Sequence, residues 1–285
     1  MSQPRVWLIT GASSGFGRAV TEVALEQGEI VVGTARRPAD LDDLAAKHPE
    51  NLLVVTCDVT KPDDVLSAFS SAIHKYGRVE VVFNNAGCLI VGEIETTPED
   101  AARALFEVNF WGVVAVSKEA VRVFRDVNPK NVGGRLLNVS SGLGLEGGPT
   151  FGIYSASKHA VEGFTESLRL ELNPAWNIQI SIIAPGAFKT SAHTTGATIF
   201  PVPEAYEGEG LPSQAVRQWL ADGSGIRGDP VLGARSIFKF SKLDSPAVRW
   251  AMGKDSVAGA RAKVRRISEE TDEFASWSDN LELAV

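Results

Sequence analysis

Cysteine and histidine are scarce in this chain, and neither is arranged for cross-linking or metal binding. Cys57 and Cys88 are the only cysteines, and two cysteines cannot build the framework of several disulfides that stabilises small secreted domains. No spacing typical of zinc ligands relates the histidines, which are His48, His74, His159 and His193. We therefore expect no structural disulfide and no metal site.

The chain also lacks an excess of positive charge and long apolar runs. Its 28 Lys and Arg against 35 Asp and Glu give a formal net charge of -7, which argues against a general nucleic-acid or anionic-membrane surface. A local pocket with a few cations could still bind a small anion. No segment approaches the roughly 20 apolar residues of a membrane span, and the N-terminal apolar stretch is too short for a signal peptide. We expect a cytoplasmic protein without a nucleic-acid partner.

Short β-type runs alternate with helical patterns through the first two thirds of the chain. The runs are nearly continuous in apolar residues and often β-branched, which is typical of strands buried on both faces of a parallel sheet. They are Val6–Ile9, Ile30–Val32, Leu52–Val55, Val79–Phe83, Arg135–Val139 and Ile178–Ile183. Parallel strands need crossover connections, so this order predicts a single α/β domain over residues 1–285, with a doubly wound sheet and helices on both faces.

The chain changes character after Pro185. Residues 187–229 are rich in Gly, Pro, Thr and scattered aromatics, and a long, weakly periodic insertion is usually a lid or binding loop. Its aromatic side chains favour a hydrophobic or bulky substrate, unless they only pack the lid itself. Further along, residues 248–252 fit a last short strand, and a charged terminal helix is expected within a C-terminal extension over residues 253–285.

Three glycines follow the first predicted strand. Gly11, Gly15 and Gly17 allow a tight turn and a close approach of the backbone to a ligand. The helix expected to begin there would direct free N–H groups and the positive end of its dipole towards a pyrophosphate. The spacing is G-x-x-x-G-x-G, and the Gly-Lys-Ser/Thr ending of an NTPase loop is missing. The segment predicts a dinucleotide site, with a glycine-rich turn that binds nothing as the alternative.

Thr10-Gly11-x-x-x-Gly15-x-Gly17 resembles the fingerprint of the short-chain dehydrogenase/reductase family. Further motifs extend the resemblance over residues 5–190 in family order: Asn84-Asn85-Ala86-Gly87, Asn109, Ser141, Tyr154-x-x-x-Lys158 and Pro185-Gly186. The resemblance is to the branch of carbonyl reductases and hydroxysteroid dehydrogenases. It implies a Rossmann-type fold, a nicotinamide cofactor, and a homodimer or homotetramer formed through the helices that carry Asn109 and Tyr154.

The family pattern also implies which residues bind the cofactor. Asp58 resembles the aspartate that bonds the adenine amino group, although a helix-capping role is the alternative. Asn85 and Gly87 are expected near the central ribose, and Pro185-Gly186 with Thr190 near the nicotinamide. The full predicted set is Gly11, Ser13, Ser14, Gly15, Phe16, Gly17, Arg36, Arg37, Asp58, Val59, Asn85, Ala86, Gly87, Tyr154, Lys158, Pro185, Gly186 and Thr190.

The end of the second strand indicates which nicotinamide cofactor is used. The sequence there runs Gly33-Thr34-Ala35-Arg36-Arg37, without the acidic residue that bonds a free ribose 2′-OH. A guanidinium pairs well with a phosphate, so Arg36, assisted by Arg37, predicts NADP(H). Ser14 could donate a hydrogen bond from the glycine loop. The alternative is that both arginines are solvated loop charges.

Tyr154 and Lys158 lie four residues apart in a helical pattern and therefore share one face. Hydride reduction of a ketone creates an alkoxide, so the site must stabilise the oxygen and deliver a proton. We expect Tyr154 to be the general acid/base, with its pKa lowered by the Lys158 ammonium and the oxidised nicotinamide. By resemblance, Ser141 polarises the carbonyl, Asn109 holds a water beside Lys158, and Ser140 faces the cofactor or the backbone.

Together these residues predict an NADP(H)-dependent oxidoreductase that transfers a hydride between the nicotinamide and a ketone or secondary alcohol. An epimerase or an enoyl reductase on the same fold is an alternative, and the complete Ser, Tyr, Lys and Asn set disfavours enoyl reduction. A second alternative is an NADPH-sensing regulatory protein. Such proteins often lack a catalytic residue, and none is missing here.

Overall fold

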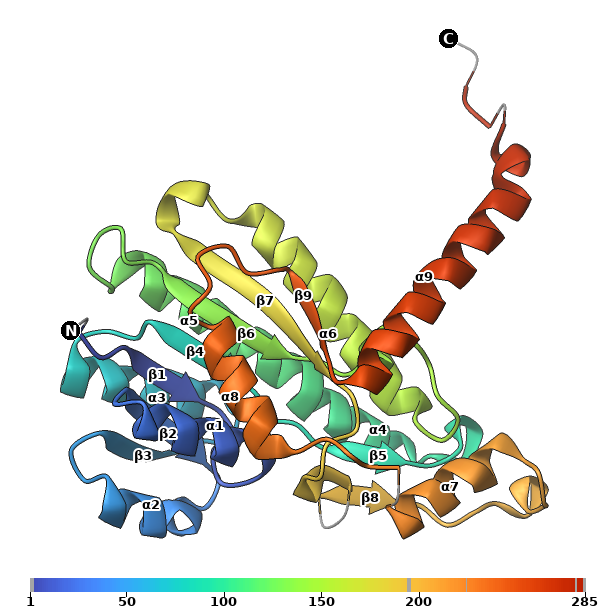
Figure 1. The fold of residues 1–285 in the computed structure, drawn as a ribbon, viewed down its shortest axis with the longest axis horizontal. Coiled ribbons are helices and arrows are strands. Elements are labelled where there is room, and N and C mark those ends of the chain that lie inside the picture. Colours follow the sequence, from blue (N-terminus) through green and yellow to red (C-terminus); the bar gives the residue numbers. More distant parts are fainter. Residues whose placement is uncertain (1–2, 194–195, 224, 280, 284–285) are drawn as a thin grey trace.

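Seven parallel strands form the central sheet of the computed structural model, which describes residues 3–193, 196–223, 225–279 and 281–283 (Figure 1). In chain order they are β1 (Val6–Ile9), β2 (Ile30–Ala35), β3 (Leu52–Thr56), β4 (Val81–Asn84), β6 (Gly134–Val139), β7 (Ile178–Pro185) and β9 (Arg249–Met252). In space their order is β3-β2-β1-β4-β6-β7-β9. The order reverses between β1 and β4, and open α/β sheets bind ligands beyond the strand ends at such a point.

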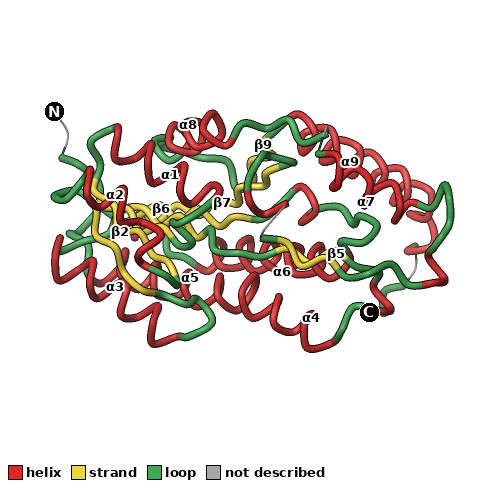
Figure 2. Tube along the Cα trace, turned by 90° about the horizontal axis from the view of Figure 1, so that it is seen from below, coloured by secondary structure: helices red, strands yellow, loops and turns green. Residues whose placement is uncertain are grey.

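Helices connect the strands and cover both faces of the sheet. They are α1 (Gly15–Glu26), α2 (Asp42–Lys47), α3 (Pro62–Tyr76), α4 (Glu99–Phe106), α5 (Gly112–Asp126), α6 (Gly152–Glu171), α7 (Pro212–Asp222), α8 (Pro230–Phe240) and α9 (Lys254–Phe274). Figure 2 shows α1 and α8 on one side of the sheet and α3, α5 and α6 on the other. This arrangement confirms the predicted Rossmann-type, doubly wound sheet.

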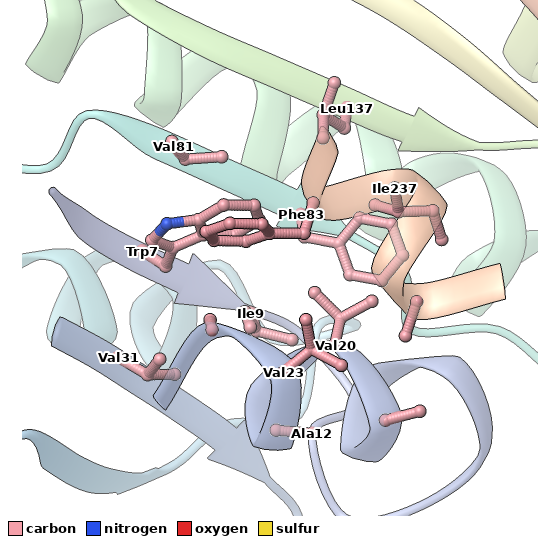
Figure 3. Close-up of a cluster of buried hydrophobic side chains, with 14 of the residues drawn as sticks. Trp7, Ile9, Ala12, Val20, Val23, Val31, Val81, Phe83, Leu137 and Ile237 are labelled. Carbon is pink, nitrogen blue, oxygen red and sulfur yellow. The ribbon is translucent and has the colours of Figure 1, made fainter. Parts of the chain in front are cut away.

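The strands are buried on both faces because successive residues point into two hydrophobic cores. In β1, Trp7 and Ile9 pack with α1 and α8, while Val6 and Leu8 pack with α3 and α5 on the opposite face. Figure 3 shows the first of these cores, with Trp7 and Ile9 facing side chains of α1 and α8. A strand in which every residue is apolar is the sequence signature of this environment.

All of the predicted strands are present; β1 has the predicted bounds, and the others have shifted ends. β2 continues to Ala35 rather than stopping at Val32, and β4 begins at Val81 rather than Val79. A second, two-stranded parallel sheet pairs β5 (Leu89–Val91) with β8 (Ala197–Ile199), and the sequence did not predict it. Strands of three residues are too short to show a periodic pattern.

The segment 187–229, predicted as a weakly structured lid, contains the strand β8 and the helix α7. Val216 and Leu220 of α7 pack against a small hydrophobic cluster that includes Leu89 and Phe151. The lid is therefore tied to the body of the molecule by a strand pairing and by apolar contacts. Outside the described residues lie positions 194, 195 and 224 of this segment.

The C-terminal extension is built around α9, and a short 3-10 helix (Ala275–Ser278) follows it. In Figure 1 helix α9 starts beside the end of β9 and runs away from the sheet into solvent. Of the extension, positions 280, 284 and 285 lie outside the described residues. No helix in the described part of the chain is long and apolar enough to cross a membrane.

Candidate active site

A cavity of about 680 Å³ opens at the carboxyl ends of the central strands. The loops that follow β1, β2, β3, β4, β6 and β7 all contribute to its wall. The predicted site residues that line it are Gly11, Ser13, Ser14, Gly15, Phe16, Arg36, Asp58, Val59, Asn85, Ala86, Gly87, Ser141, Tyr154, Lys158, Pro185, Gly186 and Thr190. Gly17, Arg37 and Asn109 do not line it.

The glycine loop has the conformation that its sequence predicts. Gly11 and Gly15 adopt positive φ angles of 65° and 52°, which side chains of other residues disfavour. Gly17 cannot carry a side chain, because a Cβ there would lie 2.1 Å from the carbonyl oxygen of Gly11. Helix α1 begins at Gly15 with no acidic residue in its first turn, and the Ser14 side chain does not cap it. The free N–H groups of this helix end therefore face the cavity and suit an anion.

Thr10 ties the glycine loop to the loop after β4. Its Oγ1 accepts hydrogen bonds from the backbone N–H groups of Asn85 and Ala86 at 2.9 and 3.0 Å. The Asn85 side chain donates back to the Thr10 carbonyl at 2.9 Å. The Asn85 amide therefore holds the two loops together across the point where the strand order reverses.

The two arginines after β2 differ in their surroundings. Arg36 is exposed at the cavity wall, with no ion-pair partner among the described residues. Arg37 does not line the cavity, 82% of its side chain is exposed, and it pairs with Asp40 at 3.1 Å. The expectation that Arg37 assists Arg36 has no support in this geometry, because Asp40 already occupies its guanidinium.

Asp58 lines the cavity and does not cap the helix that follows, because the N-cap residue of α3 is Lys61. Its Oδ1 accepts hydrogen bonds from the backbone N–H and the hydroxyl of Thr60, at 3.1 and 2.8 Å, while the residue also lines the cavity. Burial raises the pKa of the Asp58 carboxyl, but the Thr60 hydrogen bonds and the charge of Arg36 together hold the pKa below its ordinary value. A carboxylate in this state remains an acceptor at the cavity wall.

Tyr154 and Ser141 meet in the cavity from two different elements. Ser141 follows β6 and accepts a hydrogen bond from the Leu143 N–H at 3.1 Å, while Tyr154 lies in the first turn of α6. Burial raises the pKa of the Tyr154 hydroxyl to about 12, and a hydrogen bond between its side chain and Ser141 opposes the rise. Within the chain itself the desolvation of the phenolate therefore dominates, and the predicted lowering also rests on the charge of an oxidised nicotinamide.

Lys158 lies one turn further along α6. Its Nζ donates to the Val139 carbonyl at 3.1 Å and lies 5.8 Å from the centroid of the Tyr154 ring. Burial lowers the pKa of the Lys158 ammonium to about 8, against the opposing charges of Cys88 and Glu162. The two side chains share one face of the helix, as their spacing predicts.

Asn109 is fully buried in a turn of π-helix (Glu107–Trp111) between α4 and α5. Its amide exchanges two hydrogen bonds with the backbone of Cys88, both at 2.9 Å. A Cβ at Gly87 would lie 3.3 Å from Oδ1 of Asn109 and 3.6 Å from Nζ of Lys158, so both side chains lie close to the same glycine. Asn109 therefore stands behind the cavity wall next to Lys158.

Residues 5–197 match the family model for short chain dehydrogenases. The chain belongs to the short-chain dehydrogenase family. This family of oxidoreductases is the one that the motifs between residues 5 and 190 predicted.

Alignments with similar proteins extend over nearly the whole chain of this short-chain dehydrogenase. An uncharacterised oxidoreductase of Schizosaccharomyces pombe is 34% identical over 278 residues, with 96% of this chain and 90% of the relative covered. The crystal structure of a short-chain dehydrogenase from Streptomyces avermitilis has a TM-score of 0.88 at 33% identity, with 99% of this chain and 100% of that chain covered. A short chain dehydrogenase/reductase from Burkholderia phymatum, solved in complex with NAD, has a TM-score of 0.77 at 26% identity, with 99% of both chains covered.

Behind Ser141, this short-chain dehydrogenase has a buried polar cluster that its sequence did not reveal. Ser140 was predicted to face the cofactor or the backbone; it lines the cavity, and its hydroxyl donates to Oε1 of Glu162 at 2.7 Å. Glu162 is 3% exposed and forms an ion pair with Arg249 of β9. Burial raises the pKa of the Glu162 carboxyl, while the Ser140 hydrogen bond and Arg249 oppose the rise.

The end of the cavity beyond Tyr154 was also not predicted in detail. Apolar side chains line it, and they are Leu89, Leu143, Phe151 and Trp219. Helix α9 contributes Asp255, Ser256 and Gly259 to the wall. Oδ2 of Asp255 accepts a hydrogen bond from the Ala187 N–H at 2.6 Å, so the start of α9 holds the segment that follows Gly186. Among the described residues, no group of three or more His, Cys, Asp or Glu could hold a metal ion.

Proposed function

We propose that this short-chain dehydrogenase is an NADP(H)-dependent oxidoreductase that reversibly transfers a hydride between the nicotinamide and a ketone or secondary alcohol. The observation that carries the proposal is that one cavity is lined both by Ser141, Tyr154 and Lys158 and by the glycine loop with Arg36. When bound, the nicotinamide cofactor supplies or accepts the hydride. The chain's own residues have to bind the cofactor, hold the carbonyl and move the proton.

The glycine loop and the start of α1 suit the pyrophosphate of the cofactor. Two glycines of the loop have positive φ angles, and at the third, Gly17, a Cβ would clash with the Gly11 carbonyl oxygen. The loop can therefore form its cradle only with glycine at these positions. Asp58 and Val59 would contact the adenine. Pro185, Gly186 and Thr190 would lie by the nicotinamide, with Asn85, Ala86 and Gly87 along the ribose between the two ends. These roles follow the family pattern that the sequence predicted.

Tyr154 is the proton donor in the direction of reduction. A phenol with a pKa raised to about 12 is protonated at neutral pH, and it can give its proton to an alkoxide, which is a far stronger base. Ser141 donates to the carbonyl oxygen and stabilises the charge that develops there. Lys158 provides a positive charge one helical turn away, and Asn109 fixes the backbone of the loop beside it.

Arg36 is the residue that favours NADPH over NADH. It is exposed at the cavity wall without an ion-pair partner among the described residues, and no acidic residue follows β2 to bond a free 2′-OH. Arg36→Ala should raise the dissociation constant of NADPH about tenfold or more while changing that of NADH little. Arg37→Ala is the matched control, since this neighbour pairs with Asp40 outside the cavity. Equal effects on both cofactors would remove Arg36 from the phosphate site.

The substrate class follows from the apolar end of the cavity. Leu89, Leu143, Phe151 and Trp219 surround the space beyond Tyr154, which favours a hydrophobic or bulky ketone. An NADPH-oxidation screen over aldehydes, aryl ketones, steroids and sugars tests this assignment. Bulky apolar ketones should be turned over with higher kcat/KM than sugars.

Tyr154→Phe tests the reaction itself. The variant should bind NADPH with unchanged affinity and lose nearly all turnover, because it keeps the ring and removes the transferable proton. Unchanged turnover would refute the assigned role of Tyr154. Tight NADPH binding by the unmodified protein, with no turnover of any carbonyl class, would instead favour an NADPH-sensing protein on this fold.

A further inference from the structure

The outer part of helix α9 exposes apolar side chains to solvent. Beyond its first turns the helix leaves the body of the molecule, as Figure 1 shows. Val264, Ile267 and Phe274 are 64%, 46% and 48% exposed there, and Trp277 in the following turn is 76% exposed. A row of exposed large apolar side chains on a projecting helix is typical of an interaction surface.

These apolar residues form one narrow stripe along α9. Steps of three and four residues relate its members, which are Val257, Ala260, Val264, Ile267, Thr271 and Phe274. Such steps repeat every seven residues and place the side chains on one seam, the pattern by which two helices pack in a coiled coil. One polar residue, Thr271, interrupts the stripe.

Charge along α9 is divided between its two halves. From residue 254 to residue 266 the helix carries five Lys and Arg and one acidic residue, whereas residues 267–274 carry four Asp and Glu and no base. Two copies side by side in the same direction would place like charges together. Two copies in opposite directions would place each basic half against an acidic half, and complementary charges of this kind set the orientation of paired helices.

We propose that α9 pairs in an antiparallel direction with α9 of a second copy of this chain. One alignment of the two helices places Val264 opposite Ile267 of the partner subunit. In this alignment Lys263 is offset along the axis by two residues, about 3 Å, from Glu270 of the partner subunit, and Arg261 by the same amount from Asp272 of the partner subunit, which their long side chains can span. Within the described residues, Lys263, Arg261 and Asp272 have no ion-pair partner in their own chain.

This pairing would reach the active site through the base of the helix. Asp255 and Gly259 line the cavity, and Arg266 forms an ion pair with Glu146, another cavity residue, at 3.1 Å. A second copy that holds the outer half of α9 therefore also restrains the wall at the substrate end. The surface is separate from the helices α5 and α6, through which the family resemblance implies association.

Disulfide cross-linking of the full-length chain tests both the pairing and its direction. Ala260→Cys and Thr271→Cys, prepared as separate proteins and mixed under oxidation, should form a covalent dimer on a non-reducing gel. Each variant alone should not, because eleven residues along a helix separate the two positions by about 16 Å. The mixed pair Ala262→Cys and Glu269→Cys is the matched control, since these positions lie on the opposite face of α9. Cys57 and Cys88 are present in every protein compared.

Charge reversal provides a second readout in the same experiment. Lys263→Glu in both chains should lower the yield of the mixed cross-link about tenfold, since it replaces two attractive pairs with two repulsive ones. Adding Glu270→Lys should restore the yield. The proposal is overturned if the single variants cross-link with themselves, which indicates a parallel pair, if the control pair cross-links equally, or if no cross-link forms.

Discussion

The hydroxyl of Ser140 donates to Oε1 of Glu162 over 2.7 Å, and this hydrogen bond joins the end of β6 to the middle of α6. The strand end carries Ser141, and Lys158 lies one helical turn before Glu162. A Cβ at Gly144 would lie 2.2 Å from the Ser140 hydroxyl oxygen and 2.6 Å from Oε1 of Glu162, so the backbone is packed tightly over the bond. The relative position of the proposed catalytic residues therefore depends on a buried carboxylate.

Replacement of Glu162 tests this dependence. Glu162→Ala should lower the free energy of unfolding by roughly 2 kcal/mol, because Ser140 and Arg249 both lose a partner in a buried place. Glu166→Ala is the matched control, since Glu166 also contacts Arg249 but its side chain is 53% exposed. Urea denaturation measures both changes. Equal losses in the free energy of unfolding for the two variants would show that buried Glu162 stabilises the fold no more than exposed Glu166 does.

The features that the sequence predicted are local in the chain. The glycine loop and the pair Tyr154 and Lys158 each lie within eight residues, and their spacing alone specifies a turn or a shared helix face. The strands could also be predicted from local sequence, because burial on both faces of a parallel sheet requires continuous apolar runs. The family resemblance extended these local patterns into one site.

Features that depend on residues far apart in the chain could not be predicted. Glu162 is one acidic residue on a helix, and only the fold brings Arg249 to it. Likewise the start of α9 reaches Ala187 from 68 positions away. The spacing of Tyr154 and Lys158 indicates the neighbouring ammonium, but it cannot indicate the burial that raises the pKa of Tyr154 in the folded chain.

Buried Lys158 should make the stability of the protein depend on alkaline pH. Burial lowers its pKa from 10.5 to about 8 in the folded chain, so between these values the unfolded chain binds more protons than the folded one. The contribution of Lys158 to the free energy of unfolding should therefore rise by roughly 2 kcal/mol between pH 8 and pH 10, while Cys57 and Tyr154, whose pKa values burial raises, contribute with the opposite sign. Lys158→Met should abolish the rise, and the exposed Lys118→Met should retain it. Denaturation at several pH values measures the slope, and a wild-type slope in Lys158→Met would contradict the assignment.

Gly17 should tolerate no side chain. A Cβ at this position would lie 2.1 Å from the Gly11 carbonyl oxygen, so Gly17→Ala forces the backbone of the loop to move. We expect a loss of roughly 2 kcal/mol in the free energy of unfolding and a weaker binding of NADPH. Gly163→Ala, in an exposed part of α6 with open space around it, should instead stabilise the protein by about 0.5–1 kcal/mol. Thermal unfolding and a cofactor titration by fluorescence test both variants, and similar behaviour of the two would argue against the loop geometry.

Arg217 should hold the lid closed against the body. From α7 it donates to the Phe200 carbonyl at 2.7 Å and forms an ion pair at 2.7 Å with Glu93, which is 4% exposed. Arg217→Met leaves this buried carboxylate without its cation, which costs about 2–3 kcal/mol and favours opening of the segment. Limited proteolysis should then cut within residues 197–211 at least about tenfold faster, because cleavage follows the population of the open form. Arg227→Met is the matched control, because Arg227 lies in the same lid but has no ion-pair partner among the described residues. The protease should cut this variant at the wild-type rate. Equal rates for all three proteins would mean that β8 and the apolar contacts of α7 hold the lid without Arg217.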